Sequence, residues 1–127
     1  MKSNHFLVKY QYKNPVDTLY IRIIGNYDYQ DSLELSDDLS VDFDSEKVPI
    51  SIKLENASQV LEVDKKSLNH ISVIRMEIIS TPESIEFSGK LVLKIKHEDV
   101  EKTFQATADN TLDIPEIKNI FTTTGIY

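Results

Sequence analysis

The chain has 127 residues, and its 21 Asp and Glu residues outnumber its 14 Lys and Arg residues, for a formal net charge of −7. The absence of cysteine excludes disulfide bonds and thiolate metal sites. An acidic surface repels phosphate backbones and anionic lipids, so we expect neither a nucleic-acid partner nor a membrane partner. No apolar run approaches the roughly 20 residues that a membrane-spanning helix needs, and we expect a cytoplasmic protein.

The acidic residues are concentrated in the first half of the chain. Residues 1–64 hold 12 acids and 6 bases, and the stretch from Asp28 to Glu46 holds eight acids and no base. A charge run of this kind usually forms a solvated strand face that keeps the domain soluble. A basic protein partner is the alternative that the charge allows.

Alternating apolar and polar residues predict a series of half-buried β-strands. The turns between them are rich in Asn, Pro, Asp and Gly, as tight reversals require. Gly89 interrupts a later strand and predicts a bulge or a bend. The residues predicted to face inward are Phe6, Val8, Tyr10, Tyr12, Leu19, Ile21, Ile23, Leu33, Leu35, Leu39, Val41, Phe43, Val48, Ile50, Ile52, Leu54, Ile74, Met76, Ile78, Ile85, Phe87, Leu91, Leu93, Ile95, Phe104 and Ala106.

The period changes in two places. Residues 57–70 follow the cap candidate Asn56 and predict one or two short helical turns that present Val60, Leu61 and Leu68 to the sheet. Near the end of the chain, Ile114, Ile117, Ile120 and Phe121 share helical spacing around Pro115 and predict a second short helix. The tail from Thr122 to Tyr127 is expected to fray or to form a short strand.

These elements define the fold class as mainly β (α+β by strict counting), an antiparallel β-meander or sandwich with one or two short helices. We expect a single domain over residues 1–127. In it, residues 1–69 form a meander plus a short helix, and residues 70–127 add the strands that complete the core.

Residues from Val8 to Leu68 resemble the family known as domain of unknown function 2283. The first hairpin carries the likeness through its tyrosine strand, a turn ending in Asp17, and Leu19-Tyr20-Ile21-Arg22. The resemblance continues through the strand at residues 39–44 and the segment at residues 49–58. The usual glycine of the intervening turn is replaced here by Ser45 to Lys47. The resemblance implies a β-meander closed by a short helix, and it supplies no known activity or catalytic residue.

No constellation for catalysis emerges from the sequence. Asp42 and Asp44 begin a calcium-loop spacing, but Lys47 stands where that loop needs glycine and Lys53 where it needs glutamate. His97 lies in the predicted hairpin tip His97-Glu98-Asp99. We expect no cofactor, no bound metal and no catalytic residue. A metal-dependent hydrolase using Asp42, Asp44 and His97 is the enzyme alternative.

Five tyrosines lie in the first 29 residues: Tyr10, Tyr12, Tyr20, Tyr27 and Tyr29. Aromatic platforms that stack nucleic-acid bases accompany basic grooves, and this region is acidic, so we interpret the tyrosines as cross-strand packing. Apolar residues on the polar side of the strands suggest that part of the second sheet face is covered. We therefore expect a small binding protein without catalytic activity of its own, and an acidic, antitoxin-like regulator of a basic protein is the alternative. If two copies associate as a homodimer, the predicted interface is formed by Tyr20, Ile24, Ile79 and Val92.

Overall fold

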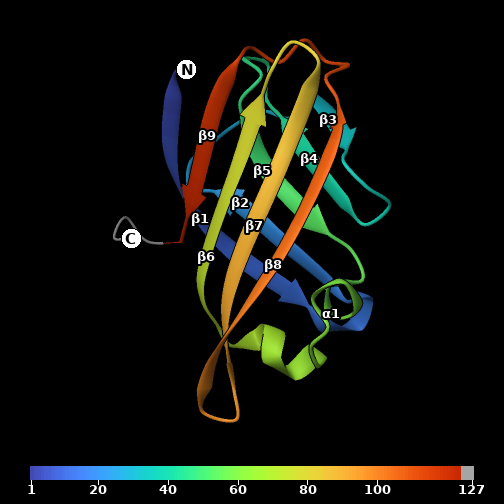
Figure 1. The fold of residues 1–127 in the computed structure, drawn as a ribbon, viewed down its shortest axis with the longest axis vertical. Coiled ribbons are helices and arrows are strands. Elements are labelled where there is room, and N and C mark those ends of the chain that lie inside the picture. The colour runs from blue at the N-terminus through green and yellow to red at the C-terminus, as the bar shows by residue number, and fades with distance from the viewer. Residues whose placement is uncertain (124–127) are drawn as a thin grey trace.

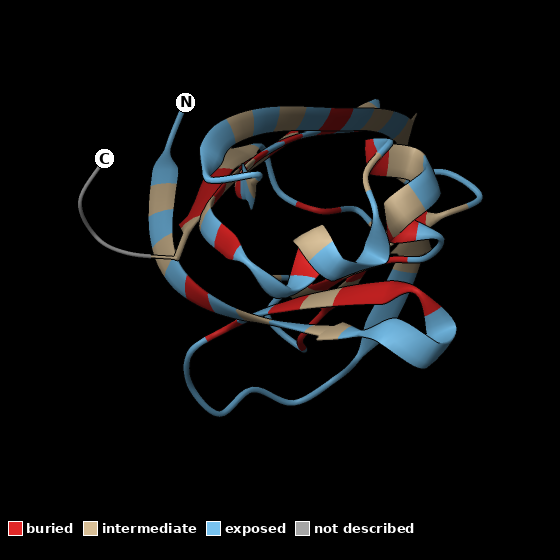
Figure 2. Cartoon of the chain, turned by 90° about the horizontal axis from the view of Figure 1, so that it is seen from below, coloured by how far each residue is buried: buried red, intermediate tan, exposed pale blue. Residues whose placement is uncertain are grey.

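The computed structural model describes residues 1–123, in which the predicted alternation forms strands. Nine strands join into one mixed sheet in the order β3-β4-β5-β2-β1-β9-β6-β7-β8, so the mainly β class is confirmed. The sheet curls back on itself (Figures 1 and 2), and its buried apolar residues form one cluster. The strands are β1 (Ser3–Lys13), β2 (Thr18–Ile23), β3 (Asp31–Glu34), β4 (Leu39–Phe43), β5 (Pro49–Leu54), β6 (Ile71–Ser80), β7 (Ser84–Ile95), β8 (Glu98–Asp109) and β9 (Ile117–Thr122).

The first strand joins the two parts of the sheet. Residues 8–13 of β1 pair antiparallel with β2, whereas residues 3–7 pair with β9 in the parallel direction. β9 in turn pairs antiparallel with β6. Strands from the two ends of the chain therefore lie side by side at the middle of the sheet.

Two short helical segments close one end of the curled sheet, near the bottom of Figure 1. They are α1 (Ala57–Leu61) and the 3₁₀ helix η2 (Lys65–Asn69), as the change of period predicts. Ala57, Leu61 and Leu68 are buried. Among residues 1–123, no helix has the length and hydrophobicity that a membrane span requires.

One hydrophobic cluster contains residues from both parts of the chain. Leu19, Val41 and Ile52 from the first part are fully buried together with Ile74 and Phe121 from the second. Burial of this extent stabilises each such side chain by about 1.5–3 kcal/mol relative to exposure. Both parts of the chain thus contribute to one cluster, and the completion of the core by residues 70–127 stays a prediction.

Two predicted features differ in the structure. The predicted helix around Pro115 is wrong, because residues 117–122 form β9 and are held by β1 on one side and β6 on the other. This strand is buried on both faces, so its apolar residues do not alternate. Residues 124–127, which include most of the predicted tail, lie outside the described residues.

Of the bulge or bend predicted at Gly89, the bulge does not form, since the pairing of β7 with β6 and β8 is continuous there. A Cβ atom at Gly89 would lie 2.6 Å from the ring of Phe104, so the glycine makes room for that ring. A register shift occurs instead between Asp42 and Phe43, opposite β5. Ile50 has no partner in that pairing and is only partly buried, although the alternation predicts that it faces inward. Pro49, which the alternation predicts to face outward, is buried opposite Phe43 instead.

Candidate functional site

Three cations lie close together on the outer face, which we define as the face of the sheet turned away from the core. Lys9 of β1 stands directly opposite Arg22 of β2. The next pair on the same face of the hairpin is Gln11 opposite Tyr20, and Lys13 follows at the end of β1. Lys9, Lys13 and Arg22 are exposed, and we call this trio the cation stripe.

The cation stripe lacks acidic partners, unlike the other cations of the outer face. Among residues 1–123, no carboxylate lies within ion-pair distance of Lys9, Lys13 or Arg22. The paired cations elsewhere on this face are Lys53 with Glu55 at 3.1 Å, Arg75 and Lys118 with Glu77 at 3.4 and 3.5 Å, Lys90 with Glu101 at 3.7 Å, and Lys94 with Asp99 at 2.7 Å.

The arrangement of Lys9 and Arg22 is unfavourable for the isolated protein. Like charges directly opposite each other on neighbouring strands destabilise a sheet. The chain contains more acids than bases, yet neither of these two facing positions carries an acid. Local departures of this kind from favourable design are expected at functional sites. A bound anion would relieve the repulsion.

An aromatic ring lies beside the stripe. The Nζ atom of Lys13 is 5.1 Å from the centroid of the Tyr20 ring, within the range of a cation–π contact. On its other side Tyr20 is in register with Lys53 of β5. The hydrogen bond to Glu55 raises the pKa of Lys53, although partial burial opposes the shift. Lys53 therefore stays charged and has a carboxylate partner, whereas within residues 1–123 no carboxylate pairs with Lys9, Lys13 or Arg22.

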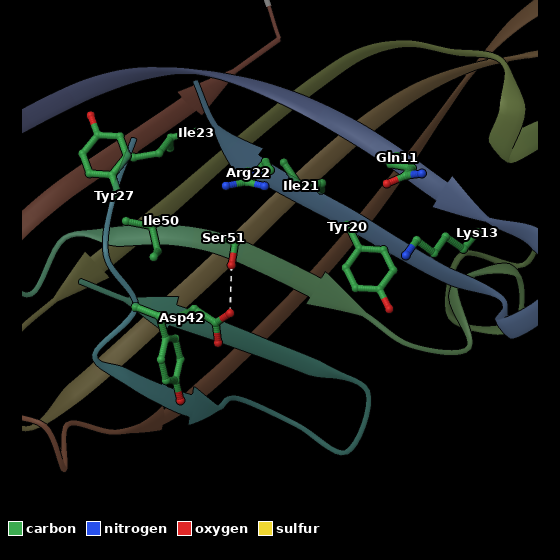
Figure 3. Close-up of a pocket in the computed structure, with 11 residues that line it drawn as sticks. Gln11, Lys13, Tyr20, Ile21, Arg22, Ile23, Tyr27, Asp42, Ile50 and Ser51 are labelled. Atoms are coloured by element: carbon green, nitrogen blue, oxygen red, sulfur yellow. Dashed lines mark hydrogen bonds between the residues drawn. The ribbon is translucent and has the colours of Figure 1, made fainter. Parts of the chain in front are cut away.

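A hollow of about 420 Å³ opens on this face and is shown in Figure 3. We call it the outer hollow. Its volume falls in the range of small-molecule sites. A neighbouring depression of about 380 Å³ shares Gln11, Tyr20 and Arg22 with it and adds Lys9 and Tyr10. The outer hollow is lined by Gln11, Lys13, Tyr20, Ile21, Arg22, Ile23, Tyr27, Tyr29, Asp42, Ile50 and Ser51.

A hydrogen-bonded network fixes the acidic side of the outer hollow. Asp42 accepts hydrogen bonds from the hydroxyl of Ser32 at 2.6 Å and from that of Ser51 at 2.9 Å. The hydroxyls of Tyr29 and Ser32 lie 2.9 Å apart. Ser51 is in register with Arg22, so the network stands one strand away from the cation stripe. The hollow thus offers a cationic side, an acidic side and aromatic walls.

The stripe has an apolar end at the start of the β1–β2 pairing. The amide of Ile24 donates a 3.0 Å hydrogen bond to the carbonyl of Leu7, and these two side chains are 57% and 48% exposed. Tyr27 follows and is 43% exposed. Its ring lies where a side chain at Gly25 would be, since a Cβ there would be 2.6 Å away. Among the described residues, no second layer covers Leu7 and Ile24.

The structure does not bring the four predicted interface residues together. Tyr20 lies on β2 and borders the outer hollow, and Ile24 follows that strand. Val92 lies on β7, which is separated from β2 by β1, β9 and β6. Ile79 on β6 is in register with Glu86 of β7, far along that strand from Val92. A homodimer through these four residues stays a prediction, and it would need two separate contact areas.

The enzyme alternative lacks a converging site. Asp42 is held by its two serines, and buried Asp44 accepts hydrogen bonds from the amides of Glu46 and Val48, both at 2.9 Å. His97 lies in the turn between β7 and β8, which protrudes at the bottom of Figure 1. Within residues 1–123, no group of three His, Asp or Glu side chains is arranged to hold a metal ion.

The sequence contained a signal for the cation stripe that the patterns alone did not reveal. A hairpin that closes between Lys13 and Thr18 sets Lys9 opposite Arg22, because paired residue numbers in an antiparallel hairpin have a constant sum. From the sequence alone the tyrosines are interpreted as cross-strand packing, because no basic groove is identified beside them. In the structure Tyr20, Tyr27 and Tyr29 line a hollow that also contains Lys13 and Arg22.

Residues 9–58 match a sequence family described as "Protein of unknown function (DUF2283)", which confirms the resemblance found in the sequence. The matched segment runs from β1 to the start of α1 and includes every residue that lines the outer hollow. No curated protein and no solved structure matches the chain. The comparisons therefore relate the site to a family of unknown function.

Proposed function

We propose that the protein acts by binding a small anionic ligand that carries a planar ring, without catalysis of its own. The observation that supports this function is the unpaired cation stripe beside Tyr20 in a chain with a net charge of −7. Arg22 would bind a phosphate or carboxylate group through its guanidinium, and Lys9 would add a second charge. The ligand's ring would pack on Tyr20, where aromatic contacts and the nearby Lys13 favour it.

A small ligand fits the site better than a long polyanion. The outer hollow has about 420 Å³, whereas a nucleic-acid strand would extend from the stripe over an acidic protein surface. The fixed acidic side at Asp42 adds selectivity, because it repels a second anionic group and accepts a hydroxyl or an amine of the ligand.

The experiment measures binding of phenyl phosphate, with inorganic phosphate and phenol as probes of the two halves of the ligand. Backbone amide shifts of the ¹⁵N-labelled full chain report the site. We expect phenyl phosphate to perturb residues around Tyr20 and Arg22, and to bind more tightly than either half. Phenylacetate replaces phenyl phosphate in a parallel titration and distinguishes a carboxylate from a phosphate ligand.

Arg22→Gln should weaken phenyl phosphate binding about tenfold, the loss of one charge-assisted hydrogen-bonding group. Lys90→Gln is the matched control, because Lys90 also lies on the outer face but pairs with Glu101. The proposal is wrong if no probe perturbs the site, or if the two variants weaken binding equally. Tighter binding of an oligonucleotide than of phenyl phosphate would also contradict it.

A further inference from the structure

The last strand of the sheet has a free edge. β8 is 12 residues long and pairs with β7 in a continuous register without a bulge. On its other side, no strand of the described chain is paired with it, although α1 contacts part of β8. β8 contains no proline, and its core-facing Val100, Ala106 and Ala108 remain half-exposed. Free edges of this kind pair readily with another strand.

The hairpin geometry shows which main-chain groups point to the free edge. Lys96 and His97 form the two-residue turn with φ values of 51° and 68°, the conformation in which the flanking pair Ile95 and Glu98 is hydrogen-bonded. At the other end of β8 the amide of Asn110 donates to the carbonyl of Glu83 at 3.0 Å, which agrees with this alternation. The amides and carbonyls of odd-numbered residues therefore point outward: Asp99, Glu101, Thr103, Gln105, Thr107 and Asp109.

We propose that this edge pairs with β8 of a second copy, antiparallel and about a two-fold axis at Thr103. A two-fold axis requires odd-numbered residues to face odd-numbered residues. With Thr103 at the axis, Glu101 faces Gln105 and Asp99 faces Thr107, so no two acids are opposed. Strand pairing from residue 99 to residue 107 would add about ten main-chain hydrogen bonds.

Charge selects among the neighbouring registers. A shift of two residues in one direction sets Asp99 opposite Asp109, which is unfavourable. The same shift in the other direction keeps acids apart but shortens the paired segment. Asp99 and Glu101 are already neutralised by Lys94 and Lys90 of β7, at 2.7 and 3.7 Å. The repulsion between the β8 edges of two copies is therefore weaker than the acids in the sequence of β8 suggest.

Lys102 is the feature that opposes such pairing, because inward-pointing charges guard natural sheet edges. It lies on the core-facing side of β8 and is half-buried. In the register centred on Thr103, it faces Phe104 of the second copy. An ammonium group beside an aromatic ring is favourable, and the stem of the lysine can cover the ring's edge. The charge of Lys102 is therefore compatible with strand pairing in this register.

The test measures the mass of the full chain by size-exclusion chromatography with light scattering. We expect a mass twice that of the 14.6-kDa chain at high micromolar concentration. Thr103→Pro should give the monomer mass and should keep the β7–β8 ladder, since the amide of residue 103 points outward. Thr103→Ala is the matched control and should remain dimeric. A monomeric parent protein, or a dimeric Thr103→Pro variant, would overturn the proposal.

Cross-linking tests the register even if the proline variant does not fold. The chain has no cysteine, so Thr103→Cys places a single thiol at the axis. Residues that face each other in a hydrogen-bonded antiparallel pair have Cα atoms about 5.5 Å apart, which a disulfide can bridge. We expect a disulfide-linked dimer from Thr103→Cys and none from Gln105→Cys. Dissociation by Val92→Glu alone would instead place the interface on the surface predicted from the sequence.

Discussion

Tyr12 donates a 2.6 Å hydrogen bond to the carboxylate of Asp17, which also accepts bonds from the amide of Ser58 at 3.0 Å and its hydroxyl at 2.7 Å. The amide of Ala57 donates to the carbonyl of Asp17 at 2.9 Å. A single buried aspartate thereby ties the β1–β2 hairpin to the start of α1, 41 residues later in the chain.

We expect Asp17→Asn to lower the free energy of unfolding by about 2 kcal/mol, because the amide replaces a charged acceptor for three donors. Asn is the suitable substitution, since residue 17 has a φ of 48° and asparagine tolerates the left-handed region. Tyr12→Phe should cost about 1 kcal/mol, the value of one hydrogen bond. Urea unfolding measures both, and equal stability of Asp17→Asn and the parent chain would contradict the assignment.

The same aspartate should contribute to acid sensitivity. Burial raises the pKa of Asp17, but hydrogen bonds from Tyr12 and Ser58 outweigh burial and lower it below the ordinary value of 3.8. Its contribution is therefore complete above that value and is lost as the pH falls through the folded-state pKa. The difference in stability between the parent chain and Asp17→Asn should shrink between pH 7 and pH 2. A constant difference over this range would show that the Asp17 charge is not involved.

Removing a charge from the cation stripe should stabilise the protein while it weakens binding. We expect Lys9→Gln to raise the free energy of unfolding by about 0.2–1 kcal/mol, because it ends the repulsion with Arg22. Lys94→Gln is the control and should be neutral or slightly destabilising, since Lys94 pairs with Asp99 at 2.7 Å. Thermal unfolding at low salt gives both values, and a clear loss of stability in Lys9→Gln would assign the lysine a structural role.

Gly89 should tolerate no side chain while Phe104 is present. A Cβ at Gly89 would lie 2.6 Å from the Phe104 ring and 3.1 Å from that of Phe87. We expect Gly89→Ala to lower stability by about 1–3 kcal/mol, the usual cost of overpacking. The effect should be smaller in a Phe104→Leu background, which a double-mutant cycle measures. Additive effects would show that the two residues do not compete for space.

A fragment ending at Asn69 should not fold cooperatively. It would lack β6 and β9, and with them buried Ile74 and Phe121. Residues 3–7 of β1 would lose their pairing with β9. A sheet whose apolar face is uncovered is not stable in water. Circular dichroism during thermal unfolding tests this expectation, and a cooperative transition like that of the full chain would make residues 1–69 an independent domain.

Local periodicity allowed most of the strands, and the helical segments α1 and η2, to be predicted, because each of these elements has one buried face. Burial on both faces is what alternation does not reveal, and Asn119, Ile120 and Phe121 are all buried in β9. Their helical spacing was therefore misleading. The shift that frees Ile50 arises from pairing between β4 and β5, which no single strand encodes.

The candidate site was missed for a related reason. Its parts come from β1, β2, β4, β5 and the loop after β2, and each part has an ordinary explanation within its own strand. Only the register sets Lys9 opposite Arg22 and places both beside Tyr20. The pairing of β1 with β9 likewise depends on residues more than a hundred positions apart.

The position of β9 also constrains when the molecule can assemble during translation. The ribosome releases β1 and β6 before β9, yet β9 lies between them in the sheet. Until residue 122 emerges, the nascent chain presents the edges of both strands without a partner. Contacts of such long sequence separation slow folding. Before β9 inserts, the exposed edges of β1 and β6 are open to pairing with other strands.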